Sequence, residues 1–284
     1  MAQLLSAKEH DLGGLMVKRV LPHPQKRMVG PFIFFDHMGP TVFKAGQGIN
    51  VRPHPHIGLS TLTYLFEGAI LHRDSIGNHL EIKPGDVNWM TAGRGIVHSE
   101  RETFEVRANK HAINGLQSWI ILPEDMAELE PSFIHTKKRD LPHLTYEGVM
   151  IRLVVGEAFG LSSPIKTYSP MFYLDIVGCD DSVIEVPNPD HETAIYPVYG
   201  KVAVGDQVFE SGEFALLDAE DKEVRFLEPG RFVMLGGEAF EKTPFMEWNF
   251  ASFSKERIEQ AKQDWREGRF PQIPNDNKEF IPYD

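Results

Sequence analysis

Short apolar segments alternate with turn-forming residues along most of this chain of 284 residues. Its 20 prolines and 24 glycines separate stretches rich in Val, Ile, Phe, Thr and Tyr, a pattern typical of an all-β barrel or sandwich. Helical periodicity is rare before the C-terminal end. We expect strands at residues 15–21, 30–40, 59–66, 69–71, 79–82, 87–90, 96–100 and 116–122.

The turn signals of the first half recur in outline in the second half. Gly77-Asn78 is a two-residue hairpin signal, and Gly205-Asp206 occupies the equivalent place later in the chain. Such self-similarity indicates an internal duplication of one barrel. We therefore predict an all-β fold of two tandem antiparallel barrels, each a double-stranded β-helix or jelly roll, followed by a helix.

The predicted helix lies near the C-terminus. Ser254 is a suitable N-cap, and Ile258, Ala261 and Trp265 fall on one face of the helix that follows. We expect this amphipathic helix to pack against a barrel and an extended tail to follow it. The polar, proline-bounded segment 123–142 favours a linker. The predicted organisation is a first barrel at 1–125, a linker at 126–142, a second barrel at 143–250, and the helix and tail at 251–284.

Composition excludes several classes of function. The 29 Lys and Arg against 41 Asp and Glu give a net charge of −12, which repels phosphate backbones and anionic lipid surfaces. We therefore expect no direct nucleic-acid or membrane binding. The single cysteine, Cys179, excludes an intrachain disulfide and fits a reducing compartment. No stretch has the pattern of a signal peptide or the length of a membrane span, so we expect a soluble cytoplasmic protein.

Two residue pairs carry the candidate chemistry. Residues i and i+2 of a strand project from the same face, so His54 and His56 point one way, as do His98 and Glu100. The proline after His54 disfavours the helical region for that residue and holds it extended. The second pair arrives 42 residues after His56, through a glycine-rich bend.

A His-x-His pair alone requires no function, because a half-buried histidine pair needs no ligand. Four such residues on converging strands are different, since pointing three imidazoles and a carboxylate into an apolar interior is costly without a bound cation. We therefore predict a mononuclear metal site formed by His54, His56, His98 and Glu100. His37, His72 and His79 are candidates to line the pocket, but histidines near turns are more often solvated. Arg94 is expected to make a surface or turn contact. Gln117 and Trp119 are candidates to reach the metal cavity or simply to fill the barrel.

Several segments resemble one known family. The pattern Gly48-x5-His54-x-His56 followed by Gly95-x-x-His98 matches the two metal motifs of the cupin superfamily. The stretches 32–36, 53–56, 64–68, 89–100 and 115–119 are similar to segments of the pirin family within it, in particular Thr-Ala-Gly-Arg-Gly at 91–95 leading into His-x-Glu at 98–100. The glutamate that cupins in general place shortly after the second histidine is replaced here by Ser60 or Thr61. The pirin pattern implies Glu100 as the carboxylate instead.

This ligand set suits Fe(II), Mn(II), Co(II), Ni(II) or Cu(II) with open positions, and Zn(II) accepts the same ligands. The pirin resemblance favours iron and implies a dioxygenase that opens a flavonol such as quercetin, with dioxygen as the second substrate and Glu100 as a base or a ligand. It also implies an alternative, a metal- and redox-dependent regulator that binds a transcription factor or a metabolic enzyme. If the barrels are duplicates, counting back from Gly200 places Val186 and Asn188 where the first barrel has His54 and His56, so the second barrel is predicted to lack the site.

Overall fold

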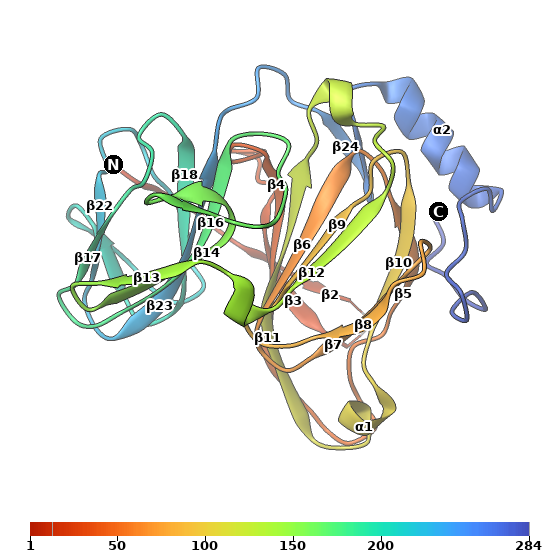
Figure 1. The fold of residues 1–284 in the computed structure, drawn as a ribbon, viewed down its shortest axis with the longest axis horizontal. Coiled ribbons are helices and arrows are strands. Elements are labelled where there is room, and N and C mark those ends of the chain that lie inside the picture. Colours follow the sequence, from red (N-terminus) through yellow and green to blue (C-terminus); the bar gives the residue numbers. More distant parts are fainter. Residues whose placement is uncertain (13, 284) are drawn as a thin grey trace. The chain divides into compact units, whose positions relative to one another are not determined.

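The computed structural model describes residues 1–12 and 14–283, which form a mostly β structure with two compact units (Figure 1). The unit named here the first barrel contains Glu9–Val17, Asp36–Lys138 and Glu241–Asp284. The second barrel contains Met1–Lys8, Lys18–Phe35 and Arg139–Phe240. The two units interleave along the chain, whereas the ranges predicted from the sequence were consecutive.

The first barrel is built on two antiparallel sheets. The smaller sheet has the order β5-β10-β7-β8, and the larger has the order β12-β9-β6-β11-β4-β3-β2, in which β3 and β4 also contribute residues to the second unit. The strands are β2 (Lys8–Asp11), β3 (Met16–Leu21), β4 (Phe32–Phe43), β5 (Val51–His56), β6 (Leu59–Glu67), β7 (Ile70–Asp74), β8 (His79–Ile82), β9 (Val87–Thr91), β10 (Ile96–Arg101), β11 (His111–Ile121) and β12 (Ser132–Thr136).

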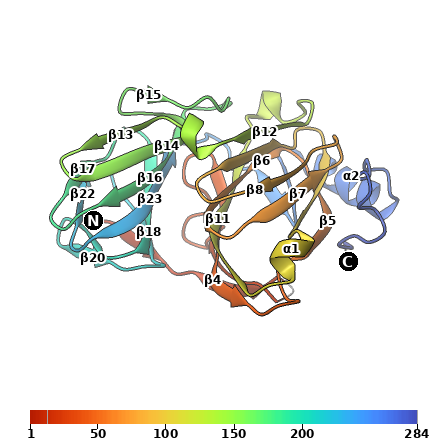
Figure 2. The same cartoon turned by 60° about the horizontal axis from the view of Figure 1, so that its bottom comes forward.

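The second barrel repeats this order strand for strand. Its sheets run β17-β22-β19-β20 and β1-β21-β18-β23-β16-β14-β13, with β15 paired to β14, and Figure 2 shows β14, β16 and β23 as neighbours. The strands are β1 (Gln3–Leu5), β13 (His143–Tyr146), β14 (Val149–Ala158), β15 (Leu161–Ser162), β16 (Met171–Gly178), β17 (Val183–Glu185), β18 (Glu192–Tyr199), β19 (Val202–Val204), β20 (Gln207–Phe209), β21 (Phe214–Leu216), β22 (Glu223–Phe226) and β23 (Gly230–Gly237). The predicted duplication and the all-β class of two antiparallel barrels are confirmed.

The segment predicted to be a linker is structured. It carries β12, which pairs with β9 (Val87–Thr91) at the edge of the larger sheet of the first barrel. Two 3₁₀ turns, Glu124–Met126 and Lys138–Asp140, flank it, and a short helix α1 (Phe104–Arg107) precedes β11. The charge of the segment and its bounding prolines indicated a linker, because the strand occupies only Ser132–Thr136 of it.

The second barrel is filled with apolar side chains where the first has histidines. Strands β17 and β22 hold the topological places of β5 and β10, and their inward residues Ile184 and Val224 are 5% and 0% exposed within one large hydrophobic cluster. The counterpart of the histidine strand is therefore Val183–Glu185. Counting residues from Gly200 placed it a few positions too late, because residues 186–191 connect β17 to β18, whereas only residues 57–58 connect β5 to β6.

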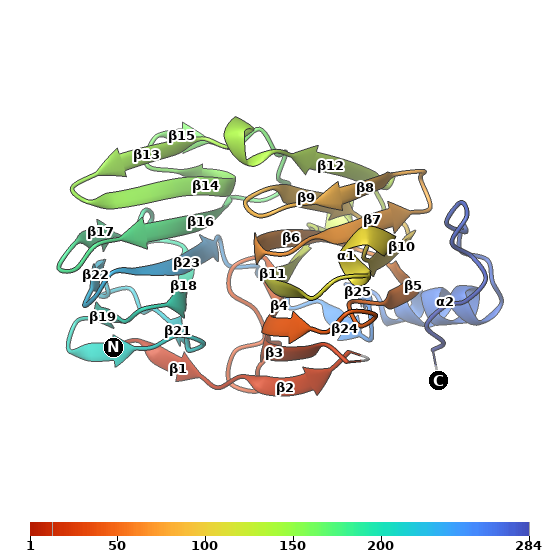
Figure 3. The same ribbon diagram turned by 90° about the horizontal axis from the view of Figure 1, so that it is seen from below.

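The C-terminal helix follows the predicted pattern. After β24 (Phe245–Glu247) and β25 (Phe250–Ser252), α2 spans Lys255–Arg266, and Ser254 Oγ accepts a hydrogen bond from the Arg257 amide. Ile258 and Ala261 are buried against Ile57, the residue that follows His56. Figure 3 shows α2 beside β5. The helix thus supports the end of the strand that carries the histidines. No helix of the described residues is long and apolar enough to span a membrane.

Candidate metal site

Three histidines converge from two neighbouring strands. On the edge strand β5, where missing amide donors of proline are tolerated, the prolines 53 and 55 hold the backbone extended around His54 and His56. His98 on β10 lies directly opposite His54 in the antiparallel register, so both side chains project to the same face. Their ligand nitrogens, with that of His56, all lie within 4.8 Å of one another, and the three side chains are 6%, 1% and 1% exposed.

The outer hydrogen bonds of two of these imidazoles fix their tautomers. Nδ1 of His54 lies 2.9 Å from the Arg52 carbonyl oxygen, and Nδ1 of His56 lies 3.1 Å from the Asn249 carbonyl oxygen. A carbonyl only accepts, so each Nδ1 carries the hydrogen and each Nε2 presents a lone pair. This is the arrangement of metal-bound histidines, whose second nitrogen donates to an oxygen.

The described residues supply too few hydrogen-bond donors for the Nε2 lone pairs of the three histidines. Nε2 of His56 and Nε2 of His98 are 3.1 Å apart, and Nδ1 of His98 is buried with no hydrogen-bond partner among the described residues. One shared proton satisfies at most one of these contacts. A cation between the nitrogens satisfies all three Nε2 atoms, so the donor set fits a single metal ion.

Burial keeps the three imidazoles uncharged, which is the state that binds a metal. Desolvation lowers the pKa of His54 to about 4. Burial and the mutual repulsion of the imidazolium forms also lower the pKa values of His56 and His98 well below the usual range. At neutral pH no protons need to leave before an ion binds.

Glu100 stands apart from this group. Its side chain is half-buried, and its carboxylate is not among the ligand atoms that lie within 4.8 Å of one another. The pairing of β10 with β5 shifts register between His98 and Glu100, which aligns Glu100 with Val51. Burial raises the pKa of Glu100 to about 7. Its predicted role as a ligand therefore remains a prediction, and its pKa suits proton transfer near neutral pH.

His72, one of the three histidines that the sequence offered as possible pocket residues, lies beside the site. It was expected to be solvated, yet it is 4% exposed, lies opposite Glu100 on β7, and its ring centroid is 5.4 Å from that of His98. Its Nε2 lies 2.9 Å from a carboxylate oxygen of Asp74, and its ring stacks on Phe133. The signal was the His-x-Asp spacing, which repeats on β7 the i, i+2 pattern of the recognised pairs.

Of the other candidate residues, some lie beside the three histidines and some contact other parts of the first barrel. Trp119 places its ring edge-on to His56 at 4.9 Å, whereas Gln117 accepts a hydrogen bond from Thr63 on β6. Arg94 pairs with Glu130 at the surface, as expected. Of the remaining histidines predicted to be solvated, His79 is exposed, and His37 is buried against Asn114. The replacements for the usual cupin glutamate are also buried, and Ser60 Oγ lies 3.0 Å from Thr91 Oγ1.

The bend before His98 requires glycine at position 93, because of its backbone conformation and its close neighbours. Gly93 has φ +51°, and a Cβ there would lie 1.9 Å from the carbonyl oxygen of Leu129. Its own carbonyl accepts a hydrogen bond from Gly58, two residues after His56. The bend therefore ties the two histidine strands together behind the site.

We expect Gly93→Ala to destabilise the protein by more than about 3 kcal/mol, because both the positive φ and the contact with Leu129 oppose a side chain. Gly77→Ala is the matched control: it also has positive φ, but its Cβ would meet nothing within 4 Å, so a cost of about 1–2 kcal/mol is expected. Urea unfolding of both variants measures the difference. Equal losses would show that the Leu129 contact contributes nothing.

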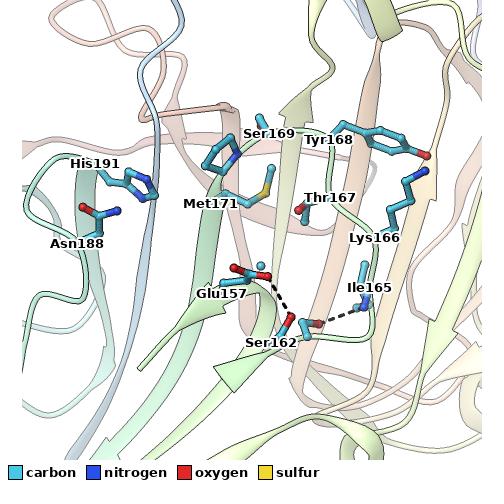
Figure 4. Close-up of a pocket in the computed structure, with 13 residues that line it drawn as sticks. Glu157, Ser162, Ile165, Lys166, Thr167, Tyr168, Ser169, Met171, Asn188 and His191 are labelled. Atoms are coloured by element: carbon cyan, nitrogen blue, oxygen red, sulfur yellow. Dashed lines mark hydrogen bonds between the residues drawn. The ribbon is translucent and has the colours of Figure 1, made fainter. Parts of the chain in front are cut away.

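The second barrel has a polar cavity of its own, of about 650 Å³ (Figure 4). His191 and Asn188 lie at one end, Lys166 lies at the other, and Ser162 donates a hydrogen bond to Glu157 between them. Within the described residues, His54, His56 and His98 are the group that meets the spacing of metal ligands, and this cavity contains no such group. Among the described residues, the candidate metal ligands therefore belong to the first barrel.

Comparison with known proteins shows the family of this chain. The model of the Pirin family matches residues 14–120, and that of the Pirin C-terminal cupin domain matches residues 173–271. A "Pirin-like protein" of Caulobacter vibrioides is 46% identical over 284 residues, covering 98% of both chains. The chain belongs to the pirin family. The predicted cupin fold is thereby confirmed. The first match covers most strands of the first barrel, and the second covers most strands of the second barrel.

Two further pirin relatives bear on function. A protein of Pseudomonas aeruginosa named "Putative quercetin 2,3-dioxygenase" is 40% identical over 270 residues, which cover 94% of this chain and 84% of that protein. The crystal structure of a quercetin 2,3-dioxygenase from Acinetobacter baumannii superimposes with a TM-score of 0.92 at 32% identity, over 100% of this pirin chain and 95% of the other.

Proposed function

We propose that this pirin is a metal-dependent dioxygenase that acts on flavonols such as quercetin, with one ion held by His54, His56 and His98. The observation that carries the proposal is the convergence of three buried imidazole nitrogens whose pKa values keep them neutral. Likeness to the quercetin 2,3-dioxygenase of Acinetobacter baumannii supports the substrate class. The ligand set suits Fe(II), Mn(II), Co(II), Ni(II) and Cu(II) alike, and Fe(II) is the proposed ion on the resemblance to the pirin family.

The bound ion would supply a Lewis acid that favours the anionic form of a flavonol hydroxyl and a site for dioxygen. The protein's own residues would do the rest. Glu100, with a pKa of about 7, would accept the proton of that hydroxyl, since a base is most effective when its pKa is near the working pH. Trp119, edge-on to His56, would bound the cavity with an aromatic surface suited to a planar substrate.

Oxygen uptake with quercetin tests the proposal. Metal-free protein is reconstituted separately with Fe(II), Mn(II), Co(II), Ni(II) and Cu(II), and dioxygen consumption is followed together with loss of the flavonol absorbance. We expect uptake that requires both the loaded protein and quercetin, with the metal-free protein and each free ion as blanks. Absence of uptake with every ion would overturn the proposed reaction, while metal binding measured on the same samples would still report on the site.

A further inference from the structure

The segment after α2 lies against the outer face of the strands that carry the histidines (Figure 1). Within this C-terminal tail, residues 267–283, the carboxylate of Asp276 is 9% exposed. It accepts hydrogen bonds from Ser99 Oγ at 2.7 Å, from Arg101 Nε at 2.9 Å and from Arg101 Nη2 at 2.8 Å. Such a bidentate arginine–carboxylate pair is among the stronger polar contacts in proteins.

The partners of Asp276 alternate with the site residues along β10. Ser99 lies between His98 and Glu100, and because side chains alternate along a strand, Ser99 and Arg101 face outward when the other two face inward. Ser99 is completely buried under the tail. The arrangement lets a contact on the outer face control the backbone position of both inner side chains.

The same stretch of β10 is weakly fixed by its neighbour on one side. The register with β5 shifts between His98 and Glu100, and a bulge leaves part of the ladder unpaired. Asp276 supplies the missing restraint at that point. It also neutralises converging positive charge, because Arg73 Nη1, on the neighbouring strand β7, lies 3.7 Å from the same carboxylate.

A second attachment joins the tail to the other histidine strand. The Ile281 amide donates to the Pro53 carbonyl oxygen at 2.9 Å, and Trp265 of α2 donates to the Ile281 carbonyl at 2.9 Å. Between the attachments the tail leaves a cavity of about 190 Å³ whose lining includes Val97 and Phe270. The tail is therefore held by these polar contacts together with apolar ones, which include the buried Ile273 and the stacking of Phe270 on Phe250.

We propose that Asp276 is a positioning residue for the metal site. Through its contacts with Ser99 and Arg101, Asp276 holds His98 and Glu100 in place. The inference rests on the proposed metal binding by His54, His56 and His98, and it adds the C-terminal tail as the element that sets the affinity of that site. It does not place Asp276 in contact with the metal or the substrate.

Asp276→Asn tests the proposal, with Ni(II) as the probe because it does not oxidise in air. Calorimetric titration is expected to show a 10- to 100-fold weaker affinity, the usual cost of losing a group that orients metal ligands. In the metal-free variant, the NMR signals of the His98 imidazole are expected to shift while those of His37 stay unchanged. Asp264→Asn is the matched control, since Asp264 pairs with Arg269 in the same C-terminal region without touching β5 or β10.

Ser99→Ala is the second variant, because it removes one hydrogen bond and leaves the Arg101 pair in place. It is expected to weaken Ni(II) binding less than Asp276→Asn, with a far-UV spectrum like that of the wild type. Unchanged affinity and unchanged His98 signals in both variants would overturn the positioning role. Failure of the wild type to bind Ni(II) would instead overturn the proposed metal site, and the metal-free NMR comparison would then decide whether Asp276 positions His98.

Discussion

His56→Ala is expected to lower the Ni(II) affinity of this pirin by more than about 100-fold, since losing a ligand costs more than the 10- to 100-fold typical of losing its supporting hydrogen bond. Oxygen uptake with quercetin is expected to fall to the metal-free level. His56 is a suitable ligand to remove because it is 1% exposed, hydrogen-bonded to Asn249, and adjacent to both His98 and Trp119. Calorimetry and oxygen uptake measure the two losses.

His79→Ala is the matched control, because His79 is an exposed histidine on β8 of the same sheet. Its affinity and turnover are expected to equal those of the wild type. Far-UV circular dichroism on both variants separates loss of ligand from loss of fold. Retention of wild-type Ni(II) affinity in folded His56→Ala would contradict the assignment of the site.

Metal-free protein is expected to lose stability steeply as the pH falls from 6.5 to 4. The unfolded state binds a proton at His54 near pH 6.5, while the folded state binds it only near pH 4, so acid favours unfolding across that window. This single shift is worth about 3 kcal/mol. The pKa values of His56 and His98 are lowered in the same direction and add to the loss.

Glu100 opposes part of this effect. Burial raises its pKa from 4.5 to about 7, so its contribution to stability grows as the pH falls through 7 toward 4.5. Three histidines outweigh one carboxyl, and the net result is destabilisation by acid. Urea unfolding at pH 7, 5.5 and 4 measures it, with His54→Gln, which removes one of the three groups, expected to have a shallower pH dependence. Equal slopes for wild type and variant would show that His54 is not buried as a neutral base.

Bound metal is expected to steepen this dependence, since protons then compete with the ion for the same nitrogens. The loaded protein should be stabilised at pH 7 by mass action and lose that gain as the ion dissociates in acid. Melting curves with and without Ni(II) at each pH give the comparison. A metal increment that stays constant from pH 7 to pH 4 would exclude imidazole ligands.

Local sequence patterns predicted much of the fold. Glycine and proline spacing located most strands of the first barrel, the Ser254 cap and its apolar face located α2, and the repeated hairpin signal revealed two barrels. The edge strand β12 was not predicted, because it is short and lies in a polar, charged segment. Its place depends on a long-range pairing with β9 that no local pattern encodes.

The sequence by itself determined the histidines of the site, because proline and i, i+2 spacing act on neighbouring residues and leave few conformations open to His54 and His56. Only the tertiary structure decided the rest. A register shift separates Glu100 from the three histidines, and the pairing of β7 with β10 places His72 opposite Glu100. The C-terminal tail places Asp276 against Ser99, the residue after His98. The physical reason is that backbone preference is local, whereas strand register, burial and pKa arise from residues far apart in the chain.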